Sequence, residues 1–79
     1  GMDTARGVVL DITRALYDSG EHGMEIKALL LYVNCADGEL RTYMRFLREI
    51  KVVENYNTEG RRAWRLTNNM TKLYSSIVA

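Results

Sequence analysis

The chain has 79 residues, the length of one small domain, with a formal net charge of +1 and a single cysteine, Cys35. One cysteine excludes an internal disulfide, and without an apolar run of about 18 residues we expect no contact with a membrane. A lone thiol is typical of a reducing compartment, so we expect a cytoplasmic protein. Gly1 before Met2 resembles the remnant of a cleaved tag, and we expect one domain over residues 2–79.

Charge is distributed unevenly along this nearly neutral chain. Residues 1–40 contain three basic and seven acidic side chains, whereas residues 41–79 contain eight basic and three acidic ones. Six of those eight bases are Arg, the side chain best suited to bidentate contacts with phosphate and guanine. Such an asymmetry between the halves of a chain indicates a polyanionic partner.

The N-terminal segment predicts a first helix that begins near Asp3 or Thr4 and ends by Ser19-Gly20. Asp and Thr side chains accept hydrogen bonds from the free N–H groups of a first helical turn, and Gly suits the left-handed position after the last turn. Apolar residues recur at helical spacing and predict one buried face, made of Ala5, Val8, Ile12, Ala15 and Leu16, with Val9 beside it.

Three short segments are expected next. Residues 24–26 predict a very short strand that pairs with a later hairpin, and residues 27–32 predict a second, mostly buried helix of about two turns. Residues 33–36 form a compact connection to a third helix, which starts at Asp37. Two short helices joined by such a turn are typical of a helix-turn-helix unit.

The third helix is expected over residues 37–50, with two contrasting faces. Leu40, Tyr43, Leu47 and Ile50 recur at three- and four-residue steps and predict the buried face, which Met44 flanks. The opposite face is polar and mostly Arg, and it comprises Gly38, Arg41, Thr42, Arg45 and Glu49, with Arg48 at its edge.

A hairpin and a final helix complete the chain. Residues 52–57 and 61–67 are rich in β-branched and aromatic residues, and the polar connection between them contains a Gly, which predicts two antiparallel strands. Alternation in the second strand predicts that Trp64 and Leu66 belong to the core, while the register that decides whether Tyr56 faces Trp64 stays open. Thr67 is expected to cap a fourth helix over residues 68–78, whose apolar stripe is Met70, Leu73, Tyr74 and Ile77.

This order of elements resembles the winged helix-turn-helix domain, and Leu40–Thr67 is the most diagnostic segment. In that segment a recognition helix is followed by an apolar pair, Val52-Val53, and by a basic wing that ends in Leu66-Thr67, as in bacterial and archaeal regulators of the multiple-antibiotic-resistance, arsenic-responsive and phenolic-acid types. The resemblance implies an α+β fold, with a three-helix core, a β-hairpin wing and a C-terminal fourth helix. Many relatives carry Gly at the position of Lys51, where the chain turns left-handed, and Lys there costs about 1 kcal/mol.

The resemblance implies sequence-specific binding of double-stranded DNA in transcriptional control, with the third helix in the major groove and the wing on flanking backbone. The residues at matching positions are Arg41, Thr42, Arg45 and Arg48 on the helix, and Arg61, Arg62 and Arg65 on the wing. The alternative interpretations are a solvated helix face and charged protection of an edge strand. A protein-docking module and a binder of RNA or single strands are the competing functions.

Nothing in the sequence predicts an enzyme, because no Ser-His-Asp set, Gly-rich phosphate loop or cluster of metal ligands is present. We therefore expect no cofactor and no metal site, and we interpret Cys35 as an inert, buried thiol. A domain this small gains stability by burying apolar surface between subunits. We expect a homodimer through the C-terminal helix, and the alternative is a monomer in which that helix folds back on the first.

Overall fold

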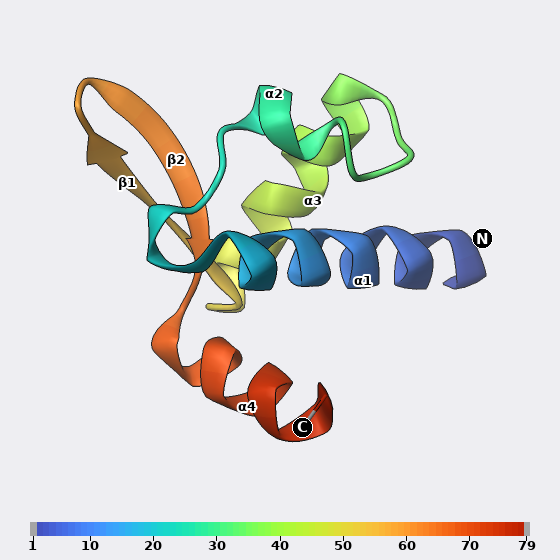
Figure 1. Ribbon diagram of the computed structural model, residues 1–79. Helices are drawn as coiled ribbons and strands as arrows, with labels where there is room; N and C mark the ends of the chain where they lie inside the picture. Colours follow the sequence, from blue (N-terminus) through green and yellow to red (C-terminus); the bar gives the residue numbers. More distant parts are fainter. Residues whose placement is uncertain (1, 79) are drawn as a thin grey trace.

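The computed structural model describes residues 2–78, with side chains from Thr4 onward. Within these residues the chain forms a small α+β domain with four α-helices and one two-stranded antiparallel hairpin. The elements are α1 (Met2–Ser19), a 3-10 turn (Gly20–His22), α2 (Ile26–Leu29), α3 (Asp37–Glu49), β1 (Val53–Thr58), β2 (Arg61–Leu66) and α4 (Asn68–Val78). Figure 1 shows α1 between α4 on one side and α2 with α3 on the other, while the hairpin projects from the end opposite the N-terminus.

The core lies where the apolar faces of α1, α2, α3 and the base of the hairpin meet. Ile12, Leu29, Leu40, Met44 and Val53 have no exposed surface. The buried faces expected for the first and third helices are therefore confirmed in their main features. None of the helices within residues 2–78 has the length and apolar composition needed to cross a bilayer.

Two expectations for the third helix are corrected. Met44, expected at the flank of the buried face, is fully buried together with Leu40 and Leu47. Ile50, expected on that face, is 54% exposed. The helix ends at Glu49, and Ile50 has left helical geometry with φ −90° and ψ 9°, so the helical period no longer directs its side chain inward.

The second helix is shorter than expected. Only Ile26–Leu29 is α-helical, and the amide groups of Leu31 and Tyr32 bond to carbonyls three residues earlier, at 3.1 and 2.9 Å. This tighter geometry turns the side chains of Leu31 and Tyr32 outward, where they are 81% and 64% exposed. The expectation of a mostly buried two-turn helix is wrong for these two residues.

The strand expected over residues 24–26 is a single bridge between Met24 and Trp64, with both main-chain hydrogen bonds at 2.8 Å. Gly23 precedes the bridge with φ +66°, and a Cβ atom at this position would lie 2.2 Å from the carbonyl oxygen of Trp64. Only glycine allows this close approach of the two main chains. The bridge joins the connection after α1 to the middle of β2.

The hairpin register pairs Val53 with Leu66, Asn55 with Trp64 and Tyr56 with Ala63. Tyr56 is therefore not opposite Trp64. Lys51 adopts the left-handed conformation expected at its position, with φ +64°. Trp64 and Leu66 are buried, as the alternation predicts.

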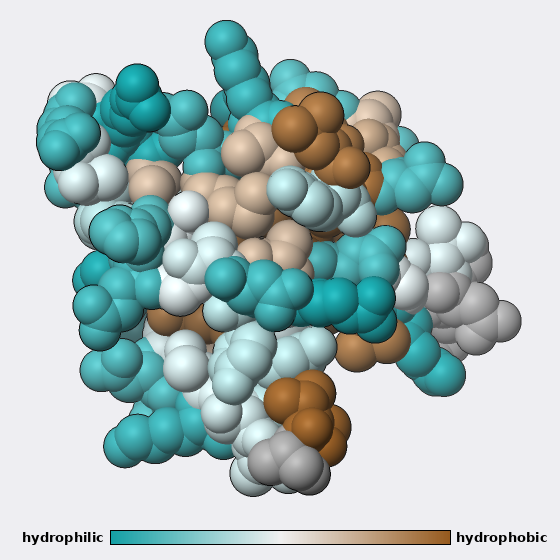
Figure 2. All heavy atoms as spheres, in the orientation of Figure 1, coloured by the Kyte–Doolittle hydropathy of each residue, from teal (hydrophilic) through white to brown (hydrophobic). Residues whose placement is uncertain are grey.

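α4 begins with the expected cap and packs on α1 along one side. The hydroxyl of Thr67 accepts a hydrogen bond from the amide of Met70 at 3.3 Å. The rings of Tyr17 and Tyr74 lie 4.8 Å apart, and the hydroxyl of Tyr17 is hydrogen-bonded to that of Ser75 at 2.7 Å. Hydrophobic surface remains at the C-terminal end of α4 (Figure 2), where more than half of Leu73, Ile77 and Val78 is exposed.

Candidate nucleic-acid interface

A hollow of about 200 Å³ lies between α3 and the hairpin, and Arg side chains dominate its lining. Arg41, Arg45 and Arg48 come from α3, and Arg62 comes from β2. Ile26 and Trp64 supply the remaining surface, and no carboxylate group lines the hollow. Four of the seven expected site residues, three from α3 and one from β2, thus line the same hollow.

Local geometry explains why these side chains meet. Arg41, Arg45 and Arg48 are spaced by four and three residues, which places them along one edge of α3. Arg62 lies two residues before Trp64 in β2, so both share the strand face that looks toward α3. The guanidinium carbon of Arg48 lies 5.9 Å from the centre of the Trp64 ring, a cation–π contact between helix and hairpin.

The N-terminal half of α3 carries two polar residues of the expected face, Arg41 and Thr42. The Nε of Arg41 donates to Oδ1 of Asp37 at 3.0 Å, and both side chains are more than half exposed. An exposed pair of this kind contributes about 0.2–1 kcal/mol, so a ligand can replace the carboxylate at little cost. Thr42 is exposed and donates to the carbonyl of Gly38 at 3.1 Å.

Arg65, expected on the wing beside the others, lies apart from them. Its Nε donates to Oε2 of Glu54 at 2.8 Å, and its guanidinium carbon lies 4.2 Å from the centre of the Tyr56 ring. It lines a second hollow, of about 380 Å³, with Tyr17 and Glu21 among others. Strand alternation puts Arg65 on the opposite face of β2 from Arg62 and Trp64, and therefore away from α3.

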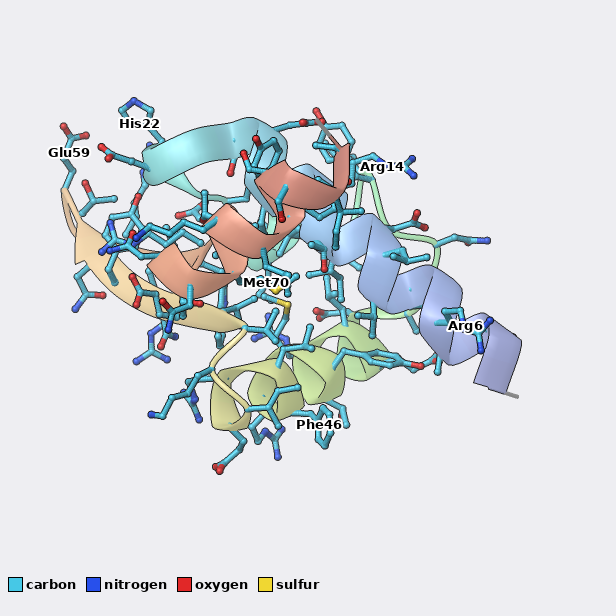
Figure 3. All side chains as sticks on the ribbon, turned by 90° about the horizontal axis from the view of Figure 1, so that it is seen from below. Arg6, Arg14, His22, Phe46, Glu59 and Met70 are labelled. Atoms are coloured by element: carbon cyan, nitrogen blue, oxygen red, sulfur yellow. The ribbon has the colours of Figure 1, made fainter. Side chains whose placement is uncertain are left out.

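The remaining bases are outside the Arg-lined hollow. Arg61 is exposed beside the hairpin turn and is not part of the lining. Figure 3 shows Glu59 at the far end of the hairpin, and Arg6 and Arg14 on α1 at the other side of the molecule. Four of the 11 basic side chains of the protein thus line this one hollow.

Sequence reasoning missed one apolar feature of α3. Phe46 is 60% exposed and points away from the rest of the molecule (Figure 3). With Tyr43 and Thr42 it lines a shallow apolar hollow of about 500 Å³. The signal in the sequence was an aromatic residue that follows Arg45 on the polar side of an otherwise regular pattern.

Cys35 is half-buried in the connection between α2 and α3. Partial burial raises the pKa of its thiol, and the Glu39 carboxylate raises that pKa further. The thiol form therefore predominates at neutral pH. Among the residues that the structure describes, no three His, Cys, Asp or Glu side chains gather as metal ligands would.

The chemistry available at the interface is the binding of anions. Guanidinium groups donate several hydrogen bonds in a fixed plane and keep their charge at any physiological pH. Four of them around one hollow, between a helix and a hairpin, suit an extended polyanion.

Comparison of the chain with models of protein families, with curated proteins and with solved structures gives no match.

Proposed function

We propose that this protein is a winged helix-turn-helix regulator that binds double-stranded DNA in a sequence-specific manner. In this proposal α2 and α3 are the helix-turn-helix unit, α3 enters the major groove, and the β1–β2 hairpin is the wing. The observation that carries the proposal is the hollow into which Arg side chains of α3 and of β2 converge with no carboxylate in its lining.

Each part of the interface has a distinct role in the proposal. Arg41 and Arg45 precede Arg48 along the edge of α3 and Thr42 lies on its outer face, and these three residues contact base edges. Arg61 lies beside the hairpin turn and contacts phosphates of the flanking backbone. Release of Arg41 from Asp37 accompanies binding, because that exposed pair is weak.

Titration of a random-sequence duplex at several salt concentrations tests the proposal. Each phosphate that the protein neutralises lowers the slope of log affinity against log salt by about 0.9. A slope corresponding to several phosphates supports DNA binding, and selection of bound sequences then yields a preferred site. Arg14→Ala is the matched control for loss of one charge, because Arg14 is exposed on α1 away from the hairpin (Figure 3). A duplex affinity that is undetectable at low salt contradicts the proposal.

A second candidate function, docking of a partner protein, is favoured by the exposed aromatic flank of α3. Phe46 projects from the helix with a shallow apolar hollow beside it. Aromatic residues in such positions are typical anchors of protein interfaces. The two functions respond differently to Phe46→Ala: a docking module loses its partner, whereas non-specific duplex binding keeps its affinity and its salt slope.

A further inference from the structure

Arg48 and Arg62 come from two different elements and line one hollow together with Trp64. The Arg48 guanidinium carbon is 5.9 Å from the centre of the Trp64 ring, and Arg62 shares the strand face of Trp64 two residues away. We propose that these two Arg side chains clamp one phosphate group, with the Trp64 indole as the wall of the socket. The inference rests on the proposed function for the source of that phosphate, a backbone diester of duplex DNA.

The Trp64 wall of the socket is held in place before any ligand arrives. Trp64 is only 8% exposed, and its main chain is fixed by two hydrogen bonds of 2.8 Å to Met24. Contact with this ring restricts the long Arg48 side chain, which would otherwise lose rotamer freedom on binding. Preorganisation of this kind lowers the entropic cost of holding a ligand.

The charges around the socket favour an anion. Arg41, Arg45, Arg48 and Arg62 line one hollow of about 200 Å³ without a carboxylate among them. Among the side chains that the structure describes, the ion pairs are Arg41–Asp37 and Arg65–Glu54, so Arg48 and Arg62 are in neither. A phosphate between the two guanidinium groups would relieve their mutual repulsion and accept charge-assisted hydrogen bonds from both.

The position of the socket identifies phosphate rather than a base edge. Arg48 lies in the last turn of α3, on the flank next to β2, whereas Thr42 lies on the outer face. A helix in the major groove presents its outer face to the bases, and the phosphate backbone runs along its flanks. The geometry therefore assigns base contacts to the outer face and earlier turns of α3, and a fixed phosphate to the junction of its last turn with the wing.

The chain contains a single tryptophan, so the indole N–H resonance of Trp64 reports directly on the socket. Titrations by NMR would use the complete chain with two probes: a short random-sequence duplex, and inorganic tripolyphosphate as a phosphate source without DNA. We expect both probes to shift the indole resonance. Core resonances in each variant check that it folds, which is expected because both Arg side chains are exposed.

Two variants and one control locate the contact. Arg62→Ala should weaken tripolyphosphate about tenfold or more, the effect of losing a hydrogen bond to a charged group, and should remove the indole shift. Arg48→Lys keeps the charge but loses the planar contact with the ring, and should also lower the affinity for tripolyphosphate. Arg14→Ala removes one exposed charge on α1, outside the hollow, and should preserve the indole shift and change the tripolyphosphate affinity by about twofold or less.

The outcomes separate this inference from the proposed function. If the duplex binds without moving the indole resonance, and Arg62→Ala behaves like Arg14→Ala, the phosphate socket is wrong while DNA binding stands. If tripolyphosphate moves the resonance but no duplex binds, the socket is supported and the DNA proposal is overturned. If neither probe binds, both proposals are overturned.

Discussion

The guanidinium group of Arg65 stacks on the ring of Tyr56, with its carbon 4.2 Å from the ring centre. The same side chain bonds to Glu54, and the Tyr56 hydroxyl hydrogen-bonds to the main-chain carbonyl groups of Glu21 and His22. Tyr56 therefore joins the hairpin to the turn that follows α1, and Arg65 packs against Tyr56. The contacts of Arg65 stabilise the hairpin rather than offer a charge to a ligand.

Arg65→Ala is consequently expected to affect stability more than DNA binding. Loss of the partly exposed ion pair and of the cation–π contact should lower the free energy of unfolding by about 1 kcal/mol. Urea denaturation measures this change, and duplex titration measures affinity, with Arg62→Ala as the comparison. If Arg65→Ala has unchanged stability and loses as much DNA affinity as Arg62→Ala, Arg65 belongs to the DNA-binding interface.

Base readout is expected from α3. Arg45→Ala and Arg41→Ala should each cost about 1–3 kcal/mol at the preferred base pair of a selected site and relax specificity there. Titration of the selected duplex and of duplexes with single base changes measures both effects, and Arg14→Ala serves as the control. Equal affinity of both variants and the wild type for the selected site would show that α3 does not read bases.

Leu47 and Leu66 are 2% and 6% exposed and connect α3 with the hairpin base through the core. Leu→Ala at either position should lower the free energy of unfolding by about 2–5 kcal/mol, because it leaves a cavity. Leu73→Ala, at a residue that is 54% exposed on α4, should cost about 0.5 kcal/mol or less. Denaturant melts compare the three variants, and small losses at both core positions would contradict this packing.

Gly23 and Gly7 provide a matched pair of Gly→Ala substitutions. A Cβ at Gly23 would meet the Trp64 carbonyl oxygen at 2.2 Å, and the residue has φ +66°. Gly23→Ala should therefore destabilise the protein by at least about 1–3 kcal/mol. Gly7→Ala, in helix α1 with no atom within 4 Å of the added carbon, should stabilise it by about 0.5–1 kcal/mol. Melting temperatures that shift in the same direction in both variants would contradict the close approach of Gly23 to β2.

The homodimer expected from the sequence stays a prediction. α4 packs on α1 through Tyr74, as the alternative interpretation anticipated, yet Leu73 and Ile77 remain 54% and 68% exposed. If these two side chains form a subunit interface, sedimentation at micromolar concentration should detect a species of twice the 9.1 kDa chain mass. The double variant Leu73→Ser, Ile77→Ser should return it to the monomer. A wild-type protein that sediments as a 9.1 kDa species would rule out the dimer.

Local sequence patterns determined most of the secondary structure. The three- and four-residue spacing of Val8, Ile12 and Leu16 predicts the buried face of α1, because a helical period repeats without reference to the rest of the chain. The Thr67 cap and the left-handed Lys51 are equally local, since each depends on a few neighbouring residues. The same periodicity placed Arg41 and Arg45 on the exposed side of α3.

Only the tertiary structure decided which Arg side chains form one site. Alternation along β2 separates Arg62 from Arg65, but it does not reveal which face of the hairpin meets α3. That choice depends on contacts between segments distant in the chain, such as the approach of Gly23 and Met24 to Trp64. The choice brings Arg62 into the same hollow as Arg48, and it leaves Arg65 in contact with Glu54 and Tyr56. A periodic pattern describes each element about its own axis, whereas the packing of one element on another fixes their relative orientation.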